Sequence, residues 1–129
     1  MPNRRQFLAL VGLSPFALAD PAHAFEFRPY DKAAADQAIA SGKPVIIHVY
    51  ATWCLQCHIQ ASILDGLKGD KTYDGVMFFR VDYDGQRDVV AALNCSRSTI
   101  IGYKGGKEVG RMSWGVTQDA VLEVLKAVA

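Results

Sequence analysis

Residues 45–58, VIIHVYATWCLQCH, join an apolar run to two cysteines three positions apart, and this junction decides the fold. Residues 45–50 are rich in β-branched side chains and hardly alternate between polar and apolar, which is typical of a central strand covered on both faces. Beyond the cysteines, apolar residues recur at helical spacing as far as Leu67. The sequence therefore predicts that the cysteine pair lies where a strand ends and a helix begins.

Two cysteines at this spacing are consistent with a redox dithiol, with half of a metal site, or with an inert structural crosslink. A thiolate attacks a disulfide, so a redox cysteine needs a lowered pKa and an exposed sulfur. At a helix start, unpaired backbone N–H groups and the positive end of the helix dipole favour the anion. We therefore assign Cys54 as the nucleophile and Cys57, one turn further into the helix, as the resolving thiol.

The rest of the chain predicts an α/β domain. The order of elements indicates a mixed sheet of four to five strands, flanked by helices on both faces. The cysteine pair would then lie at the carboxyl end of the first core strand, where open α/β sheets place their sites. Around the junction we expect a helix over 31–41, a strand over 76–82, a helix over 87–93, a hairpin formed by 98–103 and 107–112, and a helix over 117–127.

Residues 1–24 have the form of an export signal. Arg4 and Arg5 precede an apolar stretch that is shorter than the roughly 20 residues of a membrane-spanning helix. Residues 22–24, Ala-His-Ala, fit a signal-peptidase site. We expect cleavage after Ala24, leaving residues 25–129 as one domain without stable membrane insertion, and an uncleaved anchor is the alternative.

The segment NRRQFL, residues 3–8, resembles the twin-arginine signal that carries folded proteins out of the bacterial cytoplasm. An ordinary secretory signal with two adjacent arginines is the alternative. Both routes predict a periplasmic or surface location.

The charge and cysteine content limit the function. The chain has 14 Lys and Arg, of which two precede residue 25, and 13 Asp and Glu, of which one does. The remaining domain therefore has 12 basic and 12 acidic residues and is formally neutral. The sequence has no basic stripe of the kind that binds nucleic acid, so no nucleic-acid partner is expected. A domain of about 105 residues can bury a core without crosslinks, so its cysteines are free for chemistry.

Several features of residues 44–128 together resemble the thioredoxin-fold thiol-disulfide oxidoreductases, in particular exported ones. They are Ala-x-Trp-Cys-x-x-Cys after an apolar strand, Val81-Asp82 closing the next strand, Ser98-Thr99 opening the third, and Lys-Gly-Gly-Lys in the hairpin. The resemblance implies a thioredoxin fold and a protein-disulfide reductase that uses no cofactor beyond a redox-active Cys54–Cys57 disulfide. Reduction or reshuffling of disulfides in exported proteins is the implied task, possible examples being preparation of apocytochrome c for haem attachment and repair of wrong disulfides. A membrane thiol-electron carrier would recharge the pair.

Trp53 would, by this resemblance, lie beside the sulfurs and shape the substrate surface, or it simply packs at the strand end. His48 occupies the position of a buried Asp that assists proton transfer in thioredoxins. Its imidazole would be kept neutral by burial and would accept the Cys57 proton, or it is a core histidine bonded to a backbone carbonyl.

Residues Arg97, Ser98 and Thr99 stand where the family has a cis-proline before a threonine, and with Trp53 they are the predicted substrate-binding residues. Because a cis bond before a residue other than proline costs about 2.5 to 4 kcal/mol, we predict a trans Arg97–Ser98 bond. The Ser98 hydroxyl is then expected to contact a sulfur.

A metal-binding or metal-delivery module is the alternative function, in which Cys54, Cys57, Cys95 and either His48 or His58 supply the ligands. Cys95 is expected near the active-site face, in a mixed disulfide, an intermolecular bridge or no role at all. His58 either adds positive potential or is merely exposed.

The residues between the cysteines, Leu55 and Gln56, lack the histidine of strongly oxidising relatives. This pair favours a more reducing potential.

Overall fold

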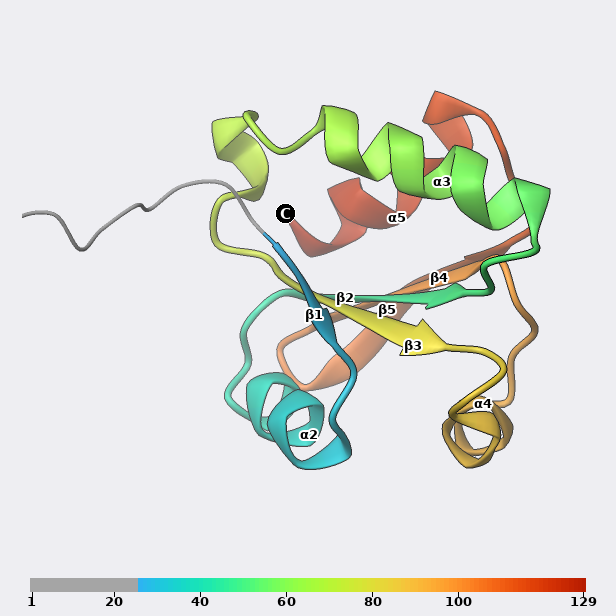
Figure 1. The fold of residues 1–129 in the computed structure, drawn as a ribbon. Helices are drawn as coiled ribbons and strands as arrows, with labels where there is room; N and C mark the ends of the chain where they lie inside the picture. The colour runs from blue at the N-terminus through green and yellow to red at the C-terminus, as the bar shows by residue number, and fades with distance from the viewer. Residues whose placement is uncertain (1–25) are drawn as a thin grey trace, which may run out of the picture.

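The computed structural model describes residues 26–129, which form a sheet between two layers of helices (Figure 1). Within them, five strands lie in the order β1-β3-β2-β4-β5. β1, β3 and β2 are parallel, whereas β4 and β5 are antiparallel to their neighbours, so the predicted mixed sheet is confirmed. The strands are β1 (Phe27–Pro29), β2 (Val45–Tyr50), β3 (Met77–Asp82), β4 (Thr99–Lys104) and β5 (Lys107–Ser113).

The helices cover the sheet in pairs. In Figure 1, α3 and α5 lie on one face of the sheet, and α2 and α4 lie on the other. Side chains of Asp31, Cys54 and Thr117 cap the amino ends of α2, α3 and α5. The helices are α2 (Lys32–Ala40), α3 (Leu55–Gly66), the 3₁₀ turn η2 (Lys71–Tyr73), α4 (Arg87–Leu93) and α5 (Gln118–Val128).

β2 runs through the middle of the core, as its continuous apolar sequence predicts. Ile46 packs into the cluster under α3 and α5, while Ile47, next along the strand, packs into the cluster on the α2 and α4 side. On the first face α5 approaches β4 so closely that a Cβ on Gly102 would lie 2.7 Å from Val128 Cγ1. Glycine at this position lets the last helix pack against the sheet.

The bounds predicted for β2 and α4 are confirmed, and the other predicted elements agree to within about two residues. β1 and η2 were not predicted, because each has three residues and shows no period. The predicted export signal lies outside the described residues. Among residues 26–129, no helix is long and apolar enough to cross a membrane.

Candidate active site

Cys54 occupies the junction between β2 and α3 and is itself the N-cap of the helix. Its backbone is extended, and its Sγ accepts a hydrogen bond from the Cys57 backbone N–H at 3.2 Å. This N–H is one of the donors left unpaired at a helix start. The predicted contact between the first cysteine and the end of α3 is therefore confirmed.

Both sulfurs are more enclosed than the sequence suggested. We expected an exposed sulfur at Cys54, but the residue keeps only 2% of its accessible surface, and Cys57 is fully buried. The pair packs against Ala51, Tyr50 and Tyr83. Enclosure strengthens each hydrogen bond to the sulfurs, because little water competes for them.

The two thiols differ in acidity in the direction that the assigned roles require. Burial raises the pKa of the Cys54 thiol, but hydrogen bonds from Cys57, Ser98 and Arg97 outweigh burial and bring that pKa below its ordinary value. Burial also raises the pKa of Cys57, and the adjacent Cys54 sulfur raises it further. Cys54 is therefore the more acidic thiol of the pair, and Cys57 is the one that holds its proton more firmly.

Ser98 faces both sulfurs. The Arg97–Ser98 peptide bond is trans, as predicted, and Ser98 has a positive φ of 59°. The Ser98 Oγ lies 3.0 Å from the Cys54 Sγ and 3.1 Å from the Cys57 Sγ, so the expected contact with a sulfur is present twice. Ser98 has no exposed surface, so its hydroxyl contacts the sulfurs and not the solvent.

Gln60, which the sequence analysis did not single out, connects the site to the core. Its side-chain Nε2 donates to the carbonyls of Ser98, at 3.0 Å, and of Gly115, at 2.8 Å. The sequence did hold a signal, since Gln60 follows Cys57 by three positions and so shares its buried helix face. Gln60 is buried on the inward face of α3, whereas its apolar neighbour Ile59 is only half-buried.

His48 is fully buried and bonds to Gln60 instead of to Cys57. Because Gln60 uses its Nε2 to donate to two carbonyls, its Oε1 accepts the 3.0 Å bond from His48 Nε2–H. This fixes the tautomer and leaves His48 Nδ1 unprotonated and without a hydrogen-bond partner among residues 26–129. Burial lowers the pKa of His48 to about 4, so the expected neutral imidazole is confirmed. Transfer of the Cys57 proton to His48 stays a prediction, and only Nδ1 is free to accept it.

An arginine between two tryptophans forms the surface next to Cys54. The Arg97 guanidinium carbon lies 4.6 Å from the Trp53 ring centre and 4.7 Å from that of Trp114. Both indoles remain about half exposed, and Trp53 Nε1 donates to Asp84 Oδ2 at 2.7 Å. Trp114 was not predicted as part of the site, because only the folded sheet brings the end of β5 beside this loop.

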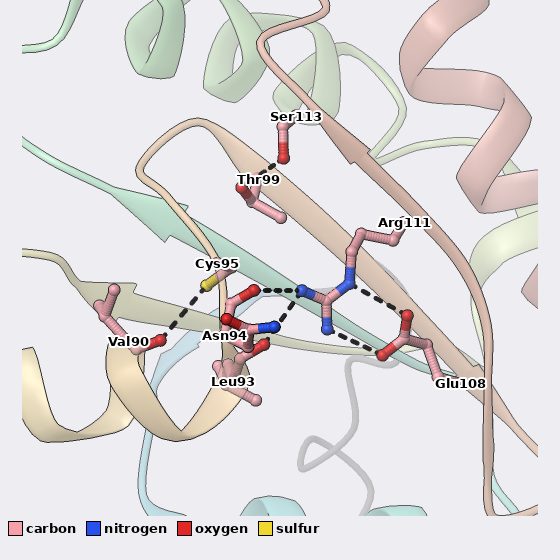
Figure 2. A network of polar contacts seen from close by, with 8 residues as sticks. All are labelled: Val90, Leu93, Asn94, Cys95, Thr99, Glu108, Arg111 and Ser113. Carbon is pink, nitrogen blue, oxygen red and sulfur yellow. Dashed lines mark hydrogen bonds and ion pairs between the residues drawn. The ribbon is translucent and has the colours of Figure 1, made fainter.

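Two predicted site residues turn away from the sulfurs. Thr99 is buried at the start of β4, and its Oγ1 bonds to Ser113 Oγ at 2.8 Å on the neighbouring strand (Figure 2). Side chains alternate along a strand, so Thr99 faces opposite to Ser98. Cys95 was expected near the active-site face, but its side chain packs on the α2 and α4 side, with its Sγ 3.9 Å from the Val90 carbonyl.

The ligands of the alternative metal site are not brought together. Within residues 26–129 no three His, Cys, Asp or Glu residues are grouped as a metal ion requires. His58 is exposed and lies between the Tyr50 hydroxyl, 3.0 Å from its Nδ1, and the Thr52 carbonyl, 2.6 Å from its Nε2. Cys54 and Cys57 lie together, but Cys95 packs on the other face of the sheet, so the predicted metal set is not assembled.

A thiol of lowered pKa at a helix amino end, with a less acidic thiol one turn away, defines a dithiol of the class that exchanges electrons with disulfides. Comparison with known proteins agrees. The family model described as Thioredoxin matches residues 27–127, and the chain belongs to the thioredoxin family. It is a protein-disulfide oxidoreductase that works by dithiol-disulfide exchange, with Cys54 and Cys57 in the C-x-x-C position.

Relatives and solved structures give the same result. Thioredoxin-2 of Saccharomyces cerevisiae is 39% identical over 79 residues, which cover 60% of this chain and 74% of that protein. Thioredoxin-1 of the same yeast is 33% identical over 95 residues, covering 73% and 89%. The crystal structure of Trxlp from Edwardsiella tarda EIB202 has a TM-score of 0.71 and 34% identity, covering 76% of this chain and 96% of that one.

Proposed function

We propose that this oxidoreductase acts in the bacterial periplasm, where it reduces or reshuffles disulfides in exported proteins. The observation that carries the chemistry is the Cys54 sulfur, which accepts a hydrogen bond at the start of α3 and lies 3.0 Å from the Ser98 hydroxyl. The location rests on residues 1–24, with their paired arginines and Ala-His-Ala sequence.

In the proposed reaction, the Cys54 thiolate attacks one sulfur of a substrate disulfide, whose other sulfur leaves with the bonding electrons and takes up a proton. Cys57 then gives up its proton, whose predicted acceptor is His48 Nδ1, and attacks the Cys54 sulfur. The second substrate sulfur leaves with the bonding electrons and takes up a proton. The substrate gains two electrons, and a Cys54–Cys57 disulfide remains. The dithiol carries both electrons, so the proposal needs no further cofactor.

The substrate surface in this proposal surrounds Cys54. Trp53, Leu55, Trp114 and Val116 are among the large apolar side chains most exposed in the described chain. Such a surface suits an extended segment of a substrate protein, with Arg97 at its centre supplying a positive charge. Exported proteins that carry a disulfide to be reduced or a wrongly paired one are the candidate substrates, and apocytochrome c is one of them.

Because the periplasm is oxidising, a reductant there must be recharged, and we propose a membrane thiol-electron carrier as the donor. The Leu55–Gln56 pair favours a reducing potential, whereas the hydrogen bonds to Cys54 favour its reduced form and raise the potential. Equilibration of the pair with a glutathione buffer would show which influence prevails. A potential in the thioredoxin range supports a reductant, and one near that of disulfide isomerases supports reshuffling.

Replacement of the nucleophile tests the chemistry. Cys54→Ser should abolish reduction of insulin disulfides, because a serine hydroxyl is not ionised near neutral pH. Cys95→Ser is the matched control, since the Cys95 sulfur contacts Val90 on the far side of the sheet, and it should keep full turnover. Turnover by the Cys54→Ser protein would contradict the assignment.

A further inference from the structure

The Ser98 hydroxyl lies almost equally far from the two reacting sulfurs. Its Oγ is 3.0 Å from Cys54 Sγ and 3.1 Å from Cys57 Sγ, so a rotation about one side-chain bond can direct its hydrogen to either of them. Because the residue has no exposed surface, water does not compete for that hydrogen. No backbone movement is needed to change partners.

The backbone of Ser98 is held from several sides. Its N–H donates to the Val49 carbonyl at 3.0 Å, and its carbonyl accepts from Trp114 N–H at 2.9 Å and from Gln60 Nε2 at 3.0 Å. With these bonds the residue is kept at a φ of 59°. Proline has neither the N–H nor access to positive φ, so the loop as built requires another residue here.

We propose that Ser98 is a catalytic residue whose hydroxyl donates a hydrogen bond first to the Cys54 thiolate and then to the Cys57 thiolate as it resolves the mixed disulfide. The proposal takes Cys54 as the attacking sulfur, and it goes beyond the proposed function by assigning a role to a third side chain. It is independent of the location and substrate of the protein.

Each hydrogen bond has its place in the reaction. While Cys54 is a thiolate, the hydroxyl points to its sulfur and stabilises the charge. After attack, Cys54 Sγ is bonded to the substrate sulfur and is neutral, so the hydroxyl turns to Cys57 as that thiol gives up its proton, whose predicted acceptor is His48 Nδ1. Cys57 then forms the bond to Cys54, and the electrons of the Cys54–substrate bond leave with the substrate sulfur. Ser98 gains and loses no proton.

The experiment uses dithionitrobenzoate as the substrate disulfide, because each step releases one coloured thiolate. Attack by Cys54 releases the first, and resolution by Cys57 releases the second. In Ser98→Ala and Ser98→Gly, loss of a hydrogen bond to a charged sulfur should move the pH profile of the first phase upward by about one unit. In the second phase, a Cys57 pKa raised by about one unit leaves about tenfold less Cys57 thiolate, but the more basic thiolate is also more nucleophilic. The two effects together should slow the second phase about threefold.

The pair of variants separates the hydroxyl from the backbone. Glycine adopts a φ of 59° readily whereas alanine does so at a cost, so a backbone effect would appear in the alanine variant alone. If alanine prevents folding, the glycine variant still carries the test. Ser113→Ala removes a hydroxyl that bonds Thr99 and not a sulfur, and it should behave as wild type.

Equal shifts in the alanine and glycine variants would support the proposal. A glycine variant with wild-type rates and pH profile in both phases would overturn it. So would a Ser113→Ala variant with the same shifts, because the effect would then not depend on contact with the sulfurs. Cys54→Ser should show neither phase, which separates a failure of the Ser98 proposal from a failure of the nucleophile assignment.

Discussion

His48 is a buried base that folding holds in its neutral form. Its Nε2–H donates to Gln60, and in the described part of the chain no group lies where it could accept a hydrogen bond from a protonated Nδ1. The imidazolium would therefore be desolvated and only partly bonded, which is why the pKa of His48 falls to about 4. The burial of this residue has a measurable effect on stability as well as on chemistry.

We predict that the protein loses stability in acid through His48. In the unfolded chain a histidine binds its proton near pH 6.5, whereas His48 in the folded chain binds it only near 4. Between these values the unfolded state holds more protons, so the free energy of unfolding falls as the pH falls, by about 3 kcal/mol in all. Urea denaturation at a series of pH values measures this slope.

The matched variants are His48→Gln, whose amide can still donate to Gln60, and His58→Gln at an exposed position. The first should remove most of the slope between about pH 6.5 and pH 4, and the second should retain it. An unchanged slope in His48→Gln would show that acid acts through other groups.

At the residue level, the cysteine roles could be predicted because they depend on local geometry. A sulfur at a helix start meets the same N–H groups in any fold. The Ser98 contact was expected from the resemblance to the thioredoxin family, in which this position faces the cysteine pair. Gln60 and Trp114 could not be assigned in this way. The hydrogen-bond partners of Gln60 lie 38 and 55 positions along the chain, so only the tertiary fold defines its role.

At the level of elements, the Arg111 side chain links β5 to the end of α4, where the loop that carries Arg97 and Ser98 begins. Arg111 on β5 donates from one nitrogen to the carbonyls of Leu93 and Asn94, each at 3.0 Å, and from its other two to Glu108 (Figure 2). Leu93 is the last residue of α4 and Asn94 is its C-cap. Carbonyls at a helix carboxyl end have no hydrogen-bond partner within the helix, so Arg111 supplies one. The loop that follows carries Arg97 and Ser98.

Arg111→Met should lower the free energy of unfolding by about 1 to 2 kcal/mol, because it keeps the length of the side chain but removes hydrogen bonds from a charged donor. The matched control is Lys32→Met, because the Lys32 side chain is 75% exposed and forms a surface ion pair with Asp36 one turn away. This control should leave stability unchanged within error. Equal effects in the two variants would mean that Arg111 contributes only a surface ion pair.

The elements also show where sequence patterns stop being informative. β2 and α4 were predicted with their observed bounds, since one is a continuous apolar run and the other lies between clear breaks. β1 has only three residues and includes Pro29, so nothing in its sequence indicates a strand. β1 is a strand only because it pairs with β3, in a register that places Phe27 opposite Phe78.

For the whole molecule, the site is formed where separate parts of the chain meet at one end of the sheet. The cysteines follow β2, Ser98 precedes β4, and Trp114 follows β5. The fold class could be predicted from element order, because strand and helix patterns alternate along the chain. How closely α3 and the two loops enclose the sulfurs could not, since that depends on packing between distant segments.

We predict that export removes residues 1–24 and leaves an active domain. When the full chain is expressed in a bacterium, the periplasmic form should begin at Phe25 by mass spectrometry, and Arg4→Lys with Arg5→Lys should retain the protein in the cytoplasm. Arg87→Lys, an exposed change within the domain, is the matched control. Membrane-bound protein that still begins at Met1 would indicate an anchor, and export of the double-lysine variant would indicate the ordinary secretory route.

The stacking of Arg97 between Trp53 and Trp114 has an optical consequence. The chain contains two tryptophans, and both indoles lie against this guanidinium beside Cys54. Indole emission responds to nearby sulfur, charge and water, and no third indole elsewhere adds a constant background. The tryptophan fluorescence of the unlabelled protein, excited at a wavelength that tyrosine does not absorb, is therefore a signal from the active site, through which the arrival of a substrate and the closing of the disulfide can be followed in real time.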